Sequence, residues 1–259
     1  MTNYRIGLEN KVVAVTGGYG LLGSSITRSL LAHDAIVVIL GRSEEKFQLL
    51  KEKSGFEGSL HFVSCDVSNT DSVKSAFANV VNQFGCLDCL INNAAYSVSK
   101  IPEEMSDEDW EAGINGSLTS VFKCIRESLQ YLTSGGRIIN VSSMYGSVSP
   151  DFSVYDEFPN FFNPVNYGAG KAGVQQLTRY FANYLGPKGI TVNCVSPGPF
   201  PSEQVKKSAG FIKQLESRTA LKRVGSDDDI GGVFAFLASD QASFITGQNI
   251  FVDGGWTTR

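Results

Sequence analysis

The chain has 259 residues, of which 42% are apolar and 19% are charged, as is usual for a soluble globular protein of one large or two small domains. Its net charge of −4 argues against a nucleic-acid-binding function, which usually depends on a basic patch. The sequence contains no apolar run long enough to cross a membrane, and the first predicted strand starts too early to leave room for a signal peptide. We therefore expect a cytoplasmic protein, or one whose targeting signal was removed.

Strands and helices alternate along the chain. Apolar, β-branched runs predict strands at 11–16, 35–40, 60–64, 87–92, 136–142, 190–195 and 249–252. Helical spacing of apolar residues predicts helices at 21–33, 43–53, 70–84, 107–132, 164–185, 203–218 and 227–238. A capping box at Ser106 and Asp109 opens the fourth helix. This alternation predicts one α/β domain, a doubly wound parallel sheet of about seven strands with helices on both faces.

The first strand leads into a glycine-rich turn at residues 16–23, and a helix follows. Glycines let the backbone approach a dinucleotide pyrophosphate, and the helix N-terminus faces its negative charge. The alternative is a tight strand-to-helix turn without a ligand. The position of the turn near the chain start favours dinucleotide binding.

The end of the second strand bears on which dinucleotide binds. NAD-preferring folds usually place Asp or Glu there to bind the ribose hydroxyl, but this chain has Gly41. Arg42 follows, and its guanidinium can pair with a phosphate, while Ser43 adds a hydroxyl donor. We therefore predict a preference for NADP(H), with NAD still possible. The alternative is that Arg42 stacks on the adenine or caps the next helix.

Five cysteines fit a reducing compartment. Cys86 and Cys89 have C-x-x-C spacing, but no second cysteine or histidine cluster accompanies them. His33 and His61 lie in separate segments. We expect neither a metal site nor a disulfide.

Tyr167 and Lys171 lie four residues apart on a predicted helix, which places them on one face. Asn163 is expected to cap this helix, with Pro164 at its first position. A nearby cation favours phenolate, so we expect Lys171 to lower the pKa of Tyr167 and let it exchange a proton with an alcohol oxygen. Alone, the pair would also fit a solvated polar helix face.

Together these features resemble the short-chain dehydrogenase/reductase family, over nearly the whole chain. The matching segments are the glycine-rich turn, Cys65-Asp66-Val67, Asn92-Asn93-Ala94-Ala95, the serine segment 140–146, Tyr167 with Lys171, Ser196-Pro197-Gly198, and the C-terminal segments 221–225, 246–248 and 253–255. The resemblance implies a single NAD(P)-binding Rossmann-like domain over residues 1–259, with substrate loops at 146–163 and 198–220.

The resemblance also implies catalytic roles. Tyr167 would be the general acid/base, Lys171 would tune it and hold the nicotinamide ribose, and Ser143 would hydrogen-bond the substrate oxygen. Ser117 stands where relatives carry a catalytic asparagine, while Asn115 would point elsewhere. The expected cofactor contacts are Gly17, Tyr19, Gly20, Leu21, Leu22, Gly23, Arg42, Asp66, Val67, Asn93, Ala94, Ala95, Tyr167, Lys171, Pro197, Gly198 and Ser202.

The chain departs from the family pattern in further places. Its glycine spacing is closer to the larger sugar-nucleotide branch, although the chain is too short for that branch's substrate domain. Ala95 replaces the final glycine of its motif. Ser143 and Tyr167 are separated by a long segment, 146–163, rich in acids and aromatics. Its aromatics either wall the substrate pocket or pack on their own scaffold or a partner subunit.

We predict an NAD(P)-dependent oxidoreductase that interconverts a secondary alcohol and a ketone. The substrate would be a small molecule, and the acids and aromatics of segment 146–163 suit a sugar-like one. One rival is a sugar-nucleotide epimerase or dehydratase, and another is a catalytically silent dinucleotide sensor. The apolar positions of helices 107–132 and 164–185, which form the subunit interface in relatives, predict a homotetramer.

Overall fold

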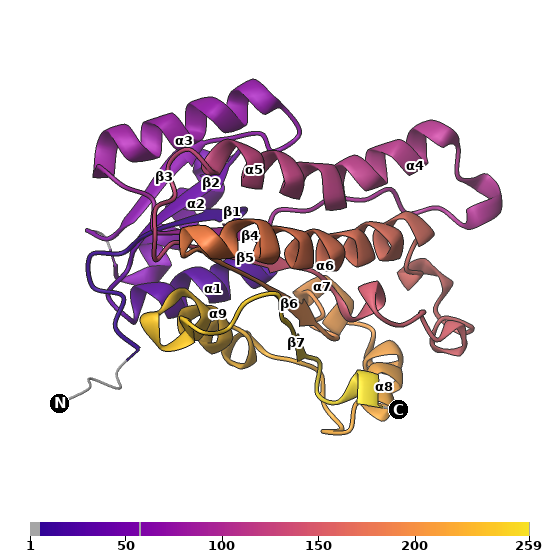
Figure 1. Ribbon diagram of the computed structural model, residues 1–259. Coiled ribbons are helices and arrows are strands. Elements are labelled where there is room, and N and C mark those ends of the chain that lie inside the picture. The colour runs from indigo at the N-terminus through magenta and orange to yellow at the C-terminus, as the bar shows by residue number, and fades with distance from the viewer. Residues whose placement is uncertain (1–5, 57, 259) are drawn as a thin grey trace.

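The structure is a computed structural model that describes residues 6–56 and 58–258. Seven parallel strands form one sheet in the order β3-β2-β1-β4-β5-β6-β7, and helices cover both of its faces (Figure 1). The strands are β1 (Val12–Thr16), β2 (Ile36–Gly41), β3 (Leu60–Ser64), β4 (Cys89–Asn92), β5 (Arg137–Val141), β6 (Thr191–Pro197) and β7 (Asn249–Val252). The predicted fold class and all seven predicted strands are confirmed.

The helices divide between the two faces of the sheet. One face is covered by α3, α5 and α6, and the other by α1, α2 and α9 (Figure 1). The helices are α1 (Leu21–Leu31), α2 (Glu44–Ser54), α3 (Thr70–Phe84), α4 (Asp107–Ile114), α5 (Ser120–Ser128), α6 (Val165–Leu185), α7 (Glu203–Lys206), α8 (Ala209–Arg218) and α9 (Gly231–Ala238). No helix among the described residues is long and apolar enough to span a membrane.

Successive residues of each central strand enter opposite cores. In β1, Val12 and Ala14 pack with α3, α5 and α6, whereas Val13 and Val15 pack with α1 and α9. Because side chains alternate across a strand, a strand covered by helices on both faces must be apolar throughout. This explains why β1 is an unbroken apolar run rather than an alternating one.

The predicted helix 107–132 is interrupted. The capping box of Ser106 and Asp109 opens α4 as predicted, but residues 115–119 form a π-helical turn before α5. Such a turn adds a residue and rotates the following side chains relative to a continuous α-helix. The periodicity of the sequence gave no sign of this break.

Three other helix predictions need correction. Helix α6 begins at Val165, because Pro164 has an extended backbone (ψ 151°), and Asn163 therefore does not cap it. The predicted helix 203–218 is two helices, α7 and α8, separated at residues 207–208. The predicted helix 227–238 starts as a 3-10 turn at 227–229, and α9 begins at Gly231.

The strand order places a crevice at the carboxyl ends of β1 and β4. From β1 the chain moves outward to β2 and β3, and then returns to the other side of β1 to form β4. In open α/β sheets, ligands bind where the winding reverses in this way. The glycine-rich turn follows β1, and the Asn92–Ala95 segment starts at the end of β4, so both meet at this point.

Candidate active site

The glycine-rich turn is shaped by close backbone contacts. Gly17 has φ +62°, a conformation that side chains rarely adopt. A Cβ at Gly23 would collide with the carbonyl oxygen of Gly17. Gly20 precedes α1 without a capping side chain, and the first turn of this helix has no acidic residue. Its free N–H groups and its dipole therefore suit a pyrophosphate.

A polar network joins the ends of β1 and β4. The Thr16 hydroxyl accepts hydrogen bonds from the backbone N–H groups of Asn93 (2.9 Å) and Ala94 (3.0 Å). The Asn93 side-chain amide donates to the carbonyl oxygens of Thr16 and Gly17, each at 3.0 Å. These bonds fix the glycine-rich turn against the segment after β4, so the crevice has a defined shape.

Tyr19 lies against the end of β2. Its hydroxyl oxygen accepts hydrogen bonds from the backbone N–H groups of Arg42 (2.9 Å) and Ser43 (3.1 Å). Its ring lies so close to Gly41 that a Cβ there would be 2.6 Å from the ring. Ser43 caps α2 by accepting from the Lys46 N–H, and it does not line the cleft. The part of Ser43 as a hydroxyl donor to the cofactor stays a prediction.

Ser143, Tyr167 and Lys171 meet at the inner end of the crevice. Ser143 follows β5, and the other two lie in the first turns of α6. The Lys171 ammonium donates to the carbonyl oxygen of Val141 at 2.7 Å and lies 5.7 Å from the centre of the Tyr167 ring. Ser143 hydrogen-bonds the Tyr167 side chain.

Burial controls the charge states of this group. Desolvation raises the pKa of Tyr167, and the hydrogen bond with Ser143 only partly opposes the rise. Burial also lowers the pKa of Lys171 to about 8. The expectation that Lys171 lowers the Tyr167 pKa is therefore wrong for this arrangement. The ammonium donates to the Val141 carbonyl oxygen, and burial rather than the Lys171 charge determines the direction of the Tyr167 pKa shift.

Hydrogen bonds also join α6 to the segment that contains Ser142 and Ser143. The Ser142 hydroxyl donates to the Lys171 carbonyl oxygen at 2.8 Å. The buried Gln175 amide lies 3.3 Å from the Ser142 hydroxyl and 3.4 Å from the Ser143 carbonyl oxygen, and it donates to both. A Cβ at Gly146 would be 2.8 Å from the Lys171 backbone, which explains the glycine there. Tyr167 and Ser143 are thereby held in a fixed relation.

The crevice is a cleft of about 560 Å³ that brings most of the predicted residues together. Its lining includes Gly17, Tyr19, Gly20, Leu21, Leu22, Arg42, Asp66, Val67, Asn93, Ala94, Ala95, Ser143, Tyr167, Lys171, Pro197 and Gly198. Gly23, Ser117 and Ser202 do not line it. The lining also includes residues that were not predicted as cofactor or catalytic contacts: Leu40, Gly41, Cys65, Tyr96, Val141, Ser142 and Phe200.

Comparisons with known proteins agree with this geometry. A family model described as enoyl-(acyl carrier protein) reductase matches residues 21–257. The 3-oxoacyl-[acyl-carrier-protein] reductase FabG of Staphylococcus aureus is 36% identical over 252 residues, which cover 95% of this chain and 97% of that protein. A 3beta-hydroxysteroid dehydrogenase of Mediterraneibacter gnavus is 31% identical, with 96% of each chain covered.

Solved structures agree as well. A short-chain dehydrogenase/reductase from Serratia marcescens has a TM-score of 0.86 at 30% identity, covering 96% of this chain and 99% of that one. A short-chain dehydrogenase from Leptospira borgpetersenii with bound NAD⁺ has a TM-score of 0.85 at 31% identity, covering 99% of this chain and 96% of that one. This chain belongs to the short-chain dehydrogenase/reductase family. It is an oxidoreductase of that family, whose members use NAD(P).

Ser117, at the family's asparagine position, is fully buried in the π-helical turn. Its hydroxyl donates to the Gly113 carbonyl oxygen at 2.7 Å, and it packs against Gly170, where a Cβ would collide with it. Asn115 is exposed. Ser117 thus joins α6 to the preceding turn, and the structure does not bring it to the cleft.

Segment 146–163, the long stretch between Ser143 and Tyr167, packs on α8. The Phe211 ring of α8 contacts Phe161 (ring centres 4.3 Å apart), Phe158 (5.7 Å) and Tyr155 (6.1 Å). Arg218 pairs with Asp151 at 2.5 Å. We call Tyr155, Phe158, Phe161, Phe211 and Trp256 the aromatic cluster. These rings therefore pack on the protein's own scaffold, as one of the two sequence-based alternatives expected, and a place beside the substrate stays a prediction.

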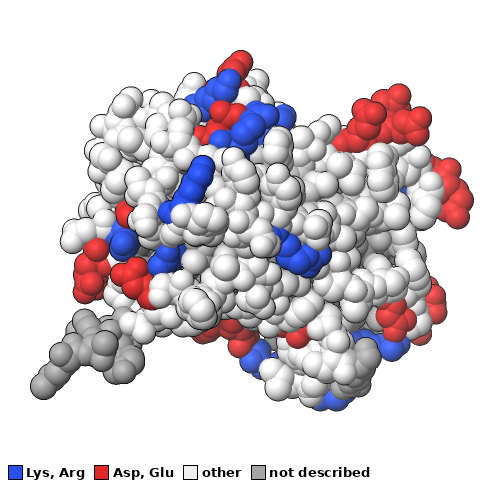
Figure 2. All heavy atoms as spheres, viewed as in Figure 1, with Lys and Arg blue, Asp and Glu red and all other residues white. Residues whose placement is uncertain are grey.

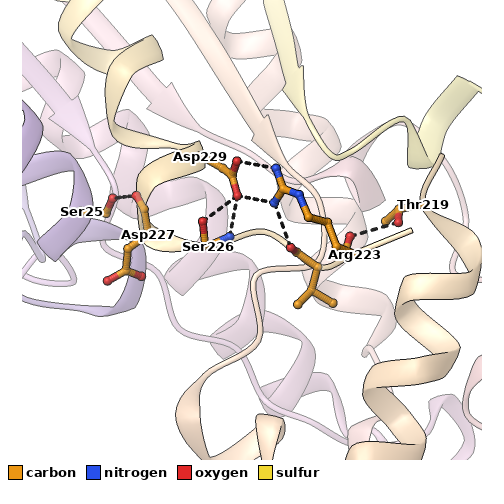
Figure 3. Close-up of polar contacts among 7 residues, drawn as sticks. Ser25, Thr219, Arg223, Ser226, Asp227 and Asp229 are labelled. Atoms are coloured by element: carbon orange, nitrogen blue, oxygen red, sulfur yellow. Dashed lines mark hydrogen bonds and ion pairs between the residues drawn. The ribbon is translucent and has the colours of Figure 1, made fainter. Parts of the chain in front are cut away.

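The chain after α8 is anchored by a second polar cluster (Figure 3). Arg223 forms two hydrogen bonds with Asp229, at 2.6 and 2.7 Å, and Asp229 also accepts from the backbone and hydroxyl of Ser226. The Arg223 hydrogen bonds hold the pKa of Asp229 well below its usual range. The Ser25 hydroxyl of α1 donates to the Asp227 carbonyl oxygen. The segment that follows α8 is therefore fixed to α1.

The five cysteines are all free thiols. Cys89 is buried in β4 and Cys86 is exposed, so the two side chains of the C-x-x-C lie in different environments. Burial raises the pKa of Cys89. A thiol of this kind is a packing residue rather than a reactive one.

Proposed function

We propose that this protein is an NADP(H)-dependent oxidoreductase that interconverts a secondary alcohol and a ketone. The observation that carries the proposal is the convergence of Ser143, Tyr167 and Lys171 at the inner end of a cleft that begins at a glycine-rich turn. A phenol with a raised pKa is protonated at neutral pH, and it can donate its proton to a carbonyl oxygen that becomes an alcohol.

The residues of the cleft fit a dinucleotide. Gly17, Gly20 and Gly23 leave the backbone and the N-terminus of α1 accessible to phosphates, and the cleft extends from this turn to Pro197 and Gly198. A bound nicotinamide would supply or accept the hydride. The protein's own tasks would be to hold the substrate oxygen with Ser143, to move the proton through Tyr167, and to keep positive charge near the phenol with Lys171.

The preference for NADP(H) rests on charge at the end of β2. Gly41 provides no carboxylate, and the Arg42 guanidinium forms no ion pair among the described residues. Arg42 is exposed at the cleft and can pair with a phosphate. Asp66 lies on the same cleft. Hydrogen bonds from Ser68, and to a smaller extent the charge of Arg42, lower its pKa.

Segments 146–163 and 198–220 would form the substrate side of this single domain. The sugar-like substrate suggested by the acids and aromatics of the first segment is one member of the panel to test. The relatives' names add 3-oxoacyl thioesters and hydroxysteroids, both of which contain a ketone or secondary alcohol. A cytoplasmic location remains a prediction from the sequence.

We further propose a homo-oligomer, most simply a tetramer, built on α5 and α6. Tyr180 and Tyr184 on α6 are 61% and 54% exposed and stack on each other, and Phe122 on α5 is exposed as well. Figure 2 shows few charged side chains over α6, whereas acidic residues gather over α4 and the turn that leads into it. Light scattering at micromolar concentration tests this proposal, and a stable monomer would contradict it.

The test of the proposed activity is a spectrophotometric assay over the substrate panel with NADPH and NADH. We expect at least one ketone to cause net loss of NADPH absorbance. Conversion of a sugar nucleotide without net change in absorbance would favour an epimerase or dehydratase. Tight dinucleotide binding without turnover of any substrate would favour a sensor.

A further inference from the structure

Ser143 lies at the start of a tightly bonded turn. It precedes a 3-10 turn, and its carbonyl oxygen accepts the backbone N–H of Gly146 at 2.9 Å. Its hydroxyl accepts the backbone N–H of Tyr145 at 3.2 Å. At the far end of the turn, the Ser147 N–H donates to the Met144 carbonyl oxygen at 2.9 Å. These bonds join residues 143–147 into one unit, so the place of the Ser143 hydroxyl depends on where the whole turn lies.

Gln175 connects both ends of this turn to α6. Its side-chain NH₂ group donates to the Ser143 carbonyl oxygen at 3.4 Å, and its side-chain oxygen accepts from the Ser147 hydroxyl at 2.9 Å. The Gln175 side chain is buried, and a Cβ at Gly146 would lie 2.7 Å from its nitrogen. The amide therefore lies directly against the turn. A buried amide with partners at both ends of a turn fixes the position of that turn on the helix.

The same helix carries Tyr167, the other partner of the Ser143 hydroxyl. Tyr167, Lys171 and Gln175 recur at every fourth position of α6, so they lie along one side of the helix. The Ser143 side chain hydrogen-bonds the Tyr167 side chain. The two partners of this bond are thus attached to one helix, Tyr167 through the backbone and Ser143 through the Gln175 amide.

The other two contacts of the amide are with hydroxyls that have a further partner. The Ser142 oxygen, 3.3 Å from the amide nitrogen, also donates to the Lys171 carbonyl oxygen at 2.8 Å. The Ser196 oxygen, 3.4 Å from the same nitrogen, donates to the Asn249 side-chain oxygen at 2.7 Å. Both serines would therefore stay anchored without Gln175. By contrast, the bond that the Ser143 carbonyl oxygen accepts from Gly146 lies within the turn, and it does not hold the turn on α6.

We propose that Gln175 is a positioning residue of the active site, which holds the turn of residues 143–147 on α6 so that the Ser143 hydroxyl stays aligned with Tyr167. The inference rests on the proposed alcohol–ketone interconversion, in which these two groups act on the substrate oxygen. It goes beyond that function because it assigns their alignment to a buried amide that does not line the cleft.

The first test compares the wild type with Gln175→Met, using NADPH and the best ketone of the panel. Methionine keeps the unbranched shape of the side chain and removes the amide. A misplacement of about 1 Å can cost about 100-fold in rate, so we expect kcat to fall about 10-fold, while dinucleotide affinity measured by calorimetry changes less than about 2-fold. Gln48→Met, at an exposed position of α2, is the matched control and should change neither quantity.

The second test asks whether Gln175 acts through Ser143. Substitutions that disturb one shared interaction are not additive, so Gln175→Met should lower kcat about 10-fold in the wild type but less than about 2-fold in a protein that already carries Ser143→Ala. Ser147→Ala releases only the other end of the turn, and it should lower kcat about 3-fold. This milder variant keeps the test informative if Gln175→Met does not fold.

Several outcomes would overturn the inference. Unchanged kcat in Gln175→Met, or in Ser147→Ala where Gln175→Met does not fold, would show that the amide does not position the turn. An equal loss in both Ser143 backgrounds would show that Gln175 does not act through Ser143. Equal losses of kcat and dinucleotide affinity would show a general structural role. A wild type that reduces no ketone, or a Tyr167→Phe protein as fast as the wild type, would instead refute the proposed function itself.

Discussion

The side of the molecule with the cleft is held by backbone groups, whereas the side with segment 146–163 and α8, whose residues do not line that cleft, is held by ring packing. On the first side, Thr16 and Asn93 bond to main-chain atoms, and the turn depends on glycines. On the second side, the Phe211 ring of α8 packs against three aromatic rings of segment 146–163. A site held by backbone geometry suits the part of the ligand that all family members bind. A site held by side-chain packing can change between family members without altering the sheet.

This difference predicts that damage to the two sides will separate cofactor binding from substrate binding. Removal of the Tyr167 hydroxyl should affect rate alone. Variants of the glycine-rich turn should affect cofactor binding, and variants of the aromatic cluster should affect substrate binding. The predictions below follow this order, from the largest expected effect to the smallest.

Tyr167→Phe should have the largest effect. It keeps the ring and removes the proton, so we expect kcat to fall about 100-fold or more, the usual scale for a general acid. The affinity for dinucleotide should stay within about 2-fold, because the glycine-rich turn is untouched. Steady-state kinetics and calorimetry measure the two quantities, and near-normal turnover would refute the assignment of Tyr167.

Gly23→Ala should damage the cofactor side. The added Cβ would collide with the Gly17 carbonyl oxygen, a backbone atom that cannot rotate away. Overpacking of this kind costs about 1–3 kcal/mol of stability, and relief of the collision would displace the turn, so we expect a lower melting temperature and dinucleotide affinity reduced about 10-fold. Gly232→Ala on α9 is the control, because a Cβ there meets nothing within 4 Å. Equal behaviour of the two variants would contradict the close-contact argument.

The rate of ketone reduction should depend on Lys171. Below its pKa of about 8, Lys171 is charged and Tyr167, whose pKa is raised, is protonated, so both groups are in the form that reduction needs. As pH rises through 8, loss of the ammonium charge removes the group that favours the developing phenolate. We expect kcat/KM for reduction to fall up to about 10-fold per pH unit above that point. A profile that stays flat to about pH 10 would contradict this role.

Phe211→Ala should damage the substrate side by a smaller amount. It removes the ring on which Tyr155, Phe158 and Phe161 converge. We expect a loss of stability of about 3 kcal/mol and a several-fold rise in KM for the substrate, with dinucleotide affinity unchanged. Thermal unfolding and kinetics with varied substrate test this, and an unchanged KM would show that segment 146–163 does not shape the substrate site.

The sequence alone was sufficient to predict most residues on the cofactor side of the cleft. Glycines, apolar strands and the Tyr167–Lys171 spacing act through local geometry, and the parallel sheet brings the strand ends together. The sequence was insufficient to predict contacts between segments that are far apart along the chain. The Tyr19 contact with Gly41, the packing of Phe211 and the buried position of Ser117 depend on three-dimensional placement. The π-helical turn at 115–119 and the raised Tyr167 pKa also follow from packing and burial rather than from local pattern.

The most direct test of the proposed activity is the ratio of alcohol formed to NADPH consumed in one reaction. The protein would be incubated with NADPH and the best ketone of the panel, and NADPH loss and alcohol formation would be quantified in the same sample. The account predicts one alcohol formed for each NADPH consumed, and neither change with Tyr167→Phe on the same timescale. Product formation without NADPH consumption, or equal rates in the variant, would contradict it.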